Sequence, residues 1–289
     1  MKHIFMLVFL LVSGFGFFAA LRWIPYFVRT RMEPFDAILT QAEVTASDNA
    51  RTRLEAQAAR RHVWSAVGAG AGFSVALLAS LPDSRVLDGA AGLFSMAGWW
   101  FGMAVGQSLS ALLPVNPPRG PVRVSAMQPH GMTDYMHRRE VVAEVGLAVL
   151  GWVSVAVGAL VLANLVDIPM SGDNAAALVL AGALLALVAT TTIVGQRRLL
   201  AAPLRAQDED GLICADIILA VGLRDLLATT MAMTVLVAWT TFFLPGRDWW
   251  LVATFTAAAV ISGGTAFGVR KRPNLAPVAR SLSARSRTA

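Results

Sequence analysis

Three side chains that can bind metal lie close together in the sequence, at His130, Asp134 and His137. Imidazole and carboxylate groups are common ligands of zinc and other transition metals, and a helix through this segment would let the three converge. Pro129 and Gly131 instead favour a loop, because neither residue suits the interior of a helix. The sequence therefore predicts no metal site here, and no cofactor is expected elsewhere in the chain.

The acidic run Asp208-Glu209-Asp210 is the second group of residues that could form a chemical site. Two carboxylates at this spacing can bind a divalent ion, but no nucleotide-binding domain surrounds them, and a solvated acidic loop is expected. The chain also lacks the G-x-x-x-x-G-K-[ST] sequence of a P-loop and the residue sets of intramembrane proteases. The sequence therefore predicts a protein that is not an enzyme.

Two polar residues, Glu144 and Gln107, fall inside long apolar segments. Ionisable groups within a bilayer are costly and usually mark function, and the predicted spans hold no other deep charge. We expect Glu144 to form a structural ion pair with Arg138 or Arg139, the alternative being a proton carrier. Gln107, together with Ser and Thr residues of neighbouring spans, is expected to serve helix packing, and the alternative is that it lines a pathway.

The composition indicates a membrane protein. Of 289 residues, 56% are hydrophobic and 15% charged, with a mean hydropathy of +0.61, whereas soluble domains have roughly 25% charged residues. The apolar residues fall in blocks of about 20, the length of helix that crosses a bilayer. The fold class is therefore predicted to be all-α membrane. The seven predicted spans lie at about 4–21, 63–81, 87–113, 141–166, 174–195, 226–244 and 249–269.

Basic residues predict the orientation of these spans. All but three of the 24 Lys and Arg residues lie in segments 22–62, 114–140, 196–225 and 270–289. Because segments rich in Lys and Arg stay in the cytoplasm, the N-terminus is predicted outside and the C-terminus inside the cell. The residue usage is that of a GC-rich bacterial genome.

The predicted transmembrane domain, residues 1–269, consists of one leading helix and three helical hairpins. The tail 270–289 is expected to be a disordered cytoplasmic segment that adheres to anionic lipid headgroups. Each inner segment is expected to extend its following span as a helix, most clearly residues 46–61 before the second span, either as a solvated stalk or as a contact for a partner. Asp134 is expected to cap the start of the fourth span.

Glycines at four-residue spacing predict close helix contacts. Gly98, Gly102 and Gly106 repeat in the third span, and Gly68 and Gly72 repeat in the second. The sequence leaves open whether these faces meet within one chain or between subunits of a homo-oligomer.

One local pattern resembles that of a known group of proteins. The basic loop that leads through Thr133-Asp134-Tyr135 into the fourth span, with the Asp-rich run 208–216 before the sixth, is similar to uncharacterised multi-pass membrane proteins of actinobacteria. The resemblance covers most of spans two to six. It implies a plasma-membrane location and no assigned activity.

The functional hypothesis is a non-catalytic membrane subunit or scaffold of a larger assembly. The alternative is a transporter for an uncharged or lipid-like substrate. Expected partners are the lipid bilayer and other membrane proteins or a second copy of the chain, and no nucleic acid is expected.

Overall fold

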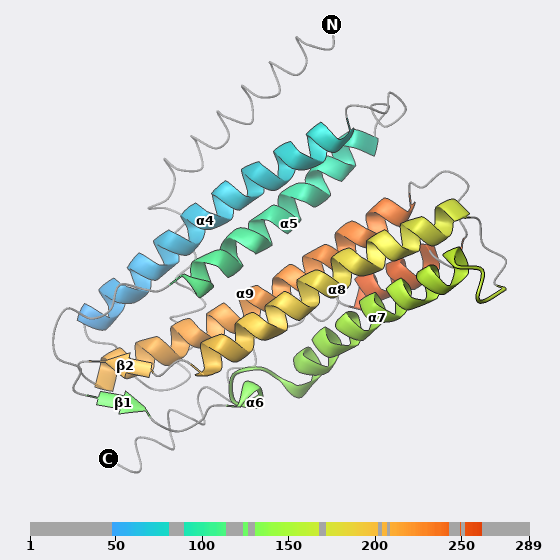
Figure 1. Cartoon of the computed structure of the whole chain (residues 1–289). Helices are drawn as coiled ribbons and strands as arrows, with labels where there is room; N and C mark the ends of the chain where they lie inside the picture. The colour runs from blue at the N-terminus through green and yellow to red at the C-terminus, as the bar shows by residue number, and fades with distance from the viewer. Residues whose placement is uncertain are drawn as a thin grey trace, which may run out of the picture.

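Long helices make up nearly all of the structure in this computed structural model (Figure 1). It describes residues 48–80, 90–113, 124–126, 131–167, 172–201, 204–206, 209–242, 249 and 252–261. The predicted first span 4–21 and the predicted tail 270–289 lie outside these residues. The described elements are α4 (Asp48–Ser80), α5 (Ala90–Leu112), β1 (Val124–Ala126), α6 (Met132–Tyr135), α7 (Arg138–Leu162), α8 (Gly172–Ala201), β2 (Leu204–Ala206) and α9 (Glu209–Phe242). A further apolar helix covers Val252–Ile261.

The helix α9 lies at the centre of the bundle. The antiparallel pair α4 and α5 packs against one side of it, mainly through α5, and the pair α7 and α8 packs against the other, mainly through α8 (Figure 1). The buried apolar side chains form two clusters along α9, one near its start and one toward its end. The predicted helical fold is confirmed for the described part of the chain.

Three described helices are long and apolar enough to cross a membrane. They are Arg138–Leu162 and Gly172–Ala201, each with a mean hydropathy of 2.4, and Cys214–Ala238 with 1.5. At about 1.5 Å per residue, even 25 residues exceed the roughly 30 Å of a bilayer's hydrocarbon core. These helices support a membrane protein.

The outer surfaces of α7 and α8 are apolar. Large hydrophobic side chains are exposed along both helices, among them Val142, Val149 and Trp152 on α7 and Leu180 and Leu187 on α8. Accordingly only 28% of the α7 apolar window and 39% of the α8 window are buried in the protein, against 72% for α9. Exposed apolar faces of this size suit contact with lipid, whereas α9 is suited to an interior position.

A short β-pair closes one end of the bundle. Residues of β1 and β2 pair antiparallel, with Val124 opposite Ala206 and Ala126 opposite Leu204. The pair lies near α6, at the end where α4, α7 and α9 begin (Figure 1). These two short strands are not predicted from the sequence.

Glycines allow α4 and α5 to touch backbone to backbone. A Cβ atom added to Gly68 would lie 2.1 Å from the carbonyl oxygen of Gly102, and one added to Gly72 would lie 2.2 Å from that of Gly98. A Cβ on Gly106 would lie 2.0 Å from the carbonyl oxygen of Trp64. All five glycines singled out from the sequence therefore lie in one contact within the chain.

The start of α4 does not form a stalk. Residues 48–61 are helical as predicted, but one face of this segment packs on α9, with Leu54 fully buried and Gln57 and Ala58 nearly so. The opposite face remains exposed at Arg51 and Glu55. The solvated-stalk interpretation is therefore wrong for the buried face, because that face carries apolar side chains that α9 covers.

The helix α9 begins well before the predicted sixth span at 226. It starts at Glu209, and its apolar window opens at Cys214. The expected acidic loop is consequently wrong at Glu209 and Asp210, which are helical, while Asp208 lies outside the described residues. The sequence boundary was displaced because Asp216, Arg224 and Asp225 interrupt the apolar run.

Candidate functional site

Buried polar side chains are concentrated on α9. Asp216, Asp225, Thr229, Thr230 and Thr234 are each at most 5% exposed. Successive helix residues are rotated by about 100°, so these groups point toward different neighbours. Three sets of interactions result, one toward α4 and α5, one toward α6, and one toward α7 and α8.

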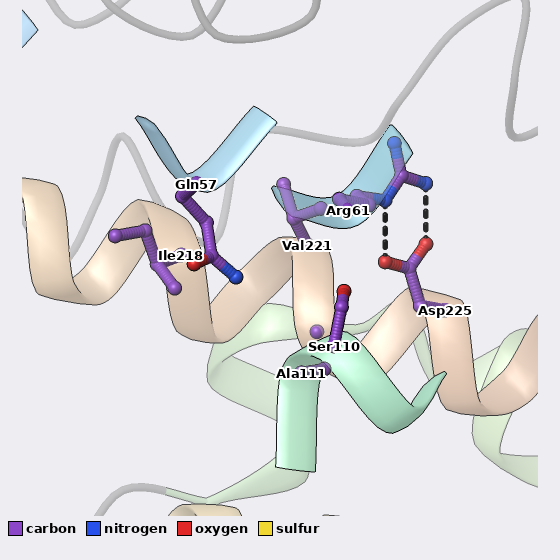
Figure 2. A pocket seen from close by; sticks show the side chains of 8 residues that line it. Gln57, Arg61, Ser110, Ala111, Ile218, Val221 and Asp225 are labelled. Atoms are coloured by element: carbon purple, nitrogen blue, oxygen red, sulfur yellow. Dashed lines mark hydrogen bonds and ion pairs between the residues drawn. The ribbon is translucent and has the colours of Figure 1, made fainter. Parts of the chain in front are cut away.

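Arg61 of α4 and Asp225 of α9 form a bidentate ion pair (Figure 2). The Nε atom of Arg61 donates to Oδ2 of Asp225 at 2.6 Å, and Nη2 donates to Oδ1 at 2.5 Å. The side chains are 20% and 6% exposed, respectively. Two parallel hydrogen bonds between a guanidinium and a carboxylate fix both distance and direction, so the pair holds α4 at one position along α9.

Polar residues of α5 complete this interface. Gln107 accepts from Arg61 Nη2 at 3.5 Å, and its amide nitrogen donates to Ser65 of α4 at 3.3 Å. Ser108 donates to the Asp225 carbonyl oxygen at 2.9 Å and lies 2.6 Å from the hydroxyl of Thr229. We call this set, Arg61, Ser65, Gln107, Ser108, Asp225 and Thr229, the Arg61 cluster. It connects three helices, and Gln107 takes part in packing there.

A small cavity lies beside the ion pair. Figure 2 shows its lining, which comes from α4 at Gln57 and Arg61, from α5 at Ser110 and Ala111, and from α9. About 10 Å³ is open to the centre of a water molecule, which is about the space that one buried water needs. The cavity is therefore too small for an organic substrate.

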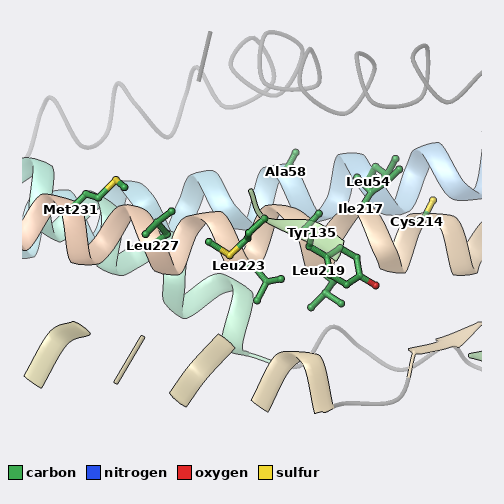
Figure 3. Close-up of a cluster of buried hydrophobic side chains, with 11 residues drawn as sticks. Leu54, Ala58, Tyr135, Cys214, Ile217, Leu219, Leu223, Leu227 and Met231 are labelled. Carbon is green, nitrogen blue, oxygen red and sulfur yellow. The ribbon is translucent and has the colours of Figure 1, made fainter. Parts of the chain in front are cut away.

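Asp216 faces α6. The Tyr135 hydroxyl donates to Asp216 Oδ1 at 3.0 Å, and both residues are fully buried. Around them the apolar side chains of α4 and α9 form a cluster that includes Leu54, Ile217 and Leu223 (Figure 3). The short helix α6 is thereby fixed on the central helix, and the predicted loop is wrong at residues 132–135.

Glu144 lies between α7, α8 and α9 and is 1% exposed. Its Oε1 accepts from the Thr192 hydroxyl at 3.1 Å, and Thr192 lies 2.7 Å from the hydroxyl of Thr230. Gln196 and Thr230 also interact with this carboxyl group. The expected ion pair with Arg138 or Arg139 is wrong, because both arginines are exposed at the start of α7 while Glu144 points into the bundle.

Glu140 lies one turn before Glu144 and caps α7. Its Oε2 accepts from the His137 amide at 2.5 Å, and His137 Nδ1 accepts from the Arg139 amide at 3.1 Å. These bonds form a reciprocal N-terminal cap. Asp134 does not cap α7 as predicted, because it belongs to the separate helix α6. Arg224 of α9 lies close enough to interact electrostatically with Glu140.

We call Glu140, Glu144, Thr192, Gln196 and Thr230 the Glu144 cluster. In the described part of the chain, no group of three His, Cys, Asp or Glu side chains is arranged to hold a metal ion. His130 of the candidate metal set lies outside that part, and His137 serves as the α7 cap.

The ion pair between Arg61 and Asp225 is not predicted from the sequence. Arg61 and Asp225 fall just before the predicted second and sixth spans, and the 164 positions between them leave no local pattern. The sequence does contain one indication of their role, because Arg61 and Asp225 are both charged residues beside an apolar run. The chain matches no protein-family model, and comparisons with curated proteins and with solved structures gave no match either.

Proposed function

We propose that this chain is a non-catalytic membrane subunit or scaffold in the bacterial plasma membrane. In this proposal it crosses the membrane seven times, with the N-terminus outside and the β1–β2 end in the cytoplasm. The positive-inside distribution of Arg and Lys supports that orientation. It also supports a cytoplasmic face that attracts anionic lipid headgroups.

The observation that carries the proposal is the Arg61 cluster. Its charged and polar groups are paired with one another across α4, α5 and α9, and the cavity beside them has room for about one water molecule. Groups that bind a substrate must be able to release their protein partners, whereas these groups hold helices in fixed positions. Such an interior suits a rigid element that presents surfaces to other proteins.

The start of α4 offers a surface for a partner. Arg51, Arg53 and Glu55 are exposed there, while the opposite face of the same helix is anchored on α9. A helix that is fixed on one face and charged on the other can present its side chains without a large loss of conformational entropy. The exposed face of residues 51–55 is therefore the proposed contact.

Purification from native membranes tests the scaffold proposal. The chain would be isolated in a mild detergent, and proteins present at stoichiometric levels would be identified by mass spectrometry. We expect a recurrent partner that is lost from a variant with Arg51, Arg53 and Glu55 changed to Ala. The matched control changes Asp167, which is also exposed but lies beyond the opposite end of α7, and should keep the partner. A chain that purifies alone would contradict the proposal.

A second candidate function is transport of an uncharged or lipid-like substrate. The observation that favours it is the burial of Glu144 of α7 beside hydroxyl groups of α8 and α9, since ionisable residues within membranes often lie on transport pathways. Flux into proteoliposomes separates the two candidates. Transport that is lost in Glu144→Gln but kept in the exposed control Glu55→Gln would favour the transporter.

A further inference from the structure

Three buried oxygen atoms of the Glu144 cluster accept no hydrogen bond from the described part of the chain. They are Glu140 Oε1, Glu144 Oε2 and Gln196 Oε1. The residues that carry them are 2%, 1% and 0% exposed. Buried acceptors without a donor are rare, because each gives up its hydrogen bonds to water without gaining a replacement. A concentration of three in one cluster points to a function.

The helical spacing brings these groups to one place. Glu140 and Glu144 are four residues apart on α7, and Thr192 and Gln196 are four apart on α8, so each pair lies on one helix face. Thr192 joins the two helices by its 3.1 Å hydrogen bond to Glu144. Gln196 also interacts with Glu144, while its amide nitrogen donates to the Leu223 carbonyl oxygen at 3.3 Å.

The hydroxyl groups nearby cannot supply the missing donors. Thr192 has one hydroxyl hydrogen, and that hydrogen already has Glu144 Oε1, the Ala189 carbonyl oxygen and Thr230 within reach. Thr230 in turn lies against Thr192 at 2.7 Å. The two hydroxyl hydrogens of Thr192 and Thr230 are therefore fewer than the oxygen atoms that surround them.

The charge of the cluster leads to the same conclusion. With both carboxyl groups ionised, Glu140 and Glu144 contribute two negative charges, and Arg224, on α9, contributes one positive charge toward Glu140. The neighbouring residues of α8, Thr192 and Gln196, are uncharged. Arg197 and Arg198 are exposed, and Asp225 is engaged with Arg61 on another face of α9. One further positive charge would neutralise the cluster.

We propose that the Glu144 cluster binds one monovalent alkali cation, with Na⁺ as the probe of choice. Hard cations prefer oxygen ligands, and carboxylate, amide carbonyl and hydroxyl oxygens are all present here. The cation would lie among Glu140, Glu144, Gln196 and Thr230, between α7, α8 and α9. This site is separate from the proposed scaffold role, because it lies on the side of α9 that faces α7 and α8, whereas the Arg61 cluster lies on the side that faces α4 and α5.

Binding of ²²Na⁺ to the purified full-length protein tests the site. In detergent, with choline chloride holding the ionic strength constant, we expect saturable binding of one ion per chain. Glu144→Gln should weaken this binding at least tenfold, because it removes the charge and keeps the shape. The control Glu55→Gln, on the exposed face of α4, should bind as the original chain does. Absence of saturable binding by the original chain would overturn the proposal.

Thermal unfolding provides a second readout that does not depend on how the variants fold. The melting temperature of the original chain should rise with NaCl and saturate, and it should not rise with choline chloride. A melting temperature that responds to pH but not to Na⁺, K⁺ or Li⁺ would overturn the cation site and assign the carboxyl group to proton binding. Equal stabilisation by all four chlorides would also overturn it, because a general salt effect requires no site.

Discussion

Removal of one partner of the Arg61–Asp225 pair should destabilise the protein far more than removal of both. In Asp225→Leu the guanidinium of Arg61 stays largely buried without its carboxylate, and in Arg61→Met the carboxylate of Asp225 loses both of its donors. Breaking a buried pair in this way costs about 3–5 kcal/mol. Because the Arg61 side chain retains 20% exposure, we expect each single variant to lose about 3 kcal/mol, the lower end of that range.

The double variant Arg61→Met, Asp225→Leu should be much closer to the original protein. It replaces two buried charges by apolar groups of similar size, an exchange that is often neutral. If the single variants each lose about 3 kcal/mol and the double variant loses about 2 kcal/mol or less, the coupling energy is at least about 4 kcal/mol. A value of this size can arise only if the two side chains interact directly in the folded protein.

The free energy of unfolding would be measured by denaturation in mixed detergent micelles and followed by circular dichroism. The matched control is the exposed pair Arg51–Glu55 on the same helix, with an N–O distance of 3.7 Å and exposures of 60% and 51%. Its coupling energy should be no more than about 0.5 kcal/mol. Additive losses at Arg61 and Asp225, within about 0.5 kcal/mol, would show that the two side chains do not stabilise one another in the folded protein.

Three other predictions concern packing, hydrogen bonding and reactivity. Gly102→Ala should destabilise the protein by about 1–3 kcal/mol in the same denaturation assay, since its Cβ would collide with the α4 backbone, whereas Gly70→Ala, which meets nothing within 4 Å, should be neutral or slightly stabilising; equal effects would contradict the α4–α5 contact. Tyr135→Phe should cost about 1.5–3 kcal/mol, because it removes a buried hydrogen bond to Asp216, and a loss below about 0.5 kcal/mol would argue against that bond. Cys214, which is 2% exposed, should react with a permeant maleimide only after denaturation, so complete labelling of the folded protein would show that the start of α9 is open.

Hydropathy located the outer helices well. The predicted span 174–195 falls within α8, Gly172–Ala201, and the prediction 141–166 covers most of α7, Arg138–Leu162. Both helices expose much of their apolar surface, so nearly every position has to be hydrophobic. For such helices, the hydropathy of the sequence is enough to predict where they lie in the chain.

The central helix α9 could not be located in the same way. Its neighbours, rather than lipid, surround it, and they supply partners for Asp216 and Asp225. A sliding hydropathy average treats these charges as the edge of a span, and it therefore moved the start to 226. The partners are Tyr135 and Arg61, which are 81 and 164 positions away. Only the packed structure brings them together.

The buried polar residues of the candidate site could be predicted from the sequence only in part. Glu144 and Gln107 stood out because each is polar within an apolar run, and both are buried in polar interactions. The partners of Glu144 were mispredicted, since Arg138 and Arg139 are near in sequence while Thr192 comes from another helix. Sequence proximity favours partners on the same helix face, whereas burial selects those from the facing helix.

The proposed topology places the β1–β2 end of the helical bundle in the cytoplasm. Cysteine accessibility in intact cells tests this orientation, with Cys214 changed to Ser and one new cysteine at Arg51 or at Asp167. Both positions are exposed, and they lie at opposite ends of the bundle. We predict that an impermeant maleimide labels the Asp167→Cys variant in intact cells and labels the Arg51→Cys variant only after permeabilisation. Labelling of Arg51→Cys in intact cells, or identical behaviour of the two variants, would contradict the claim.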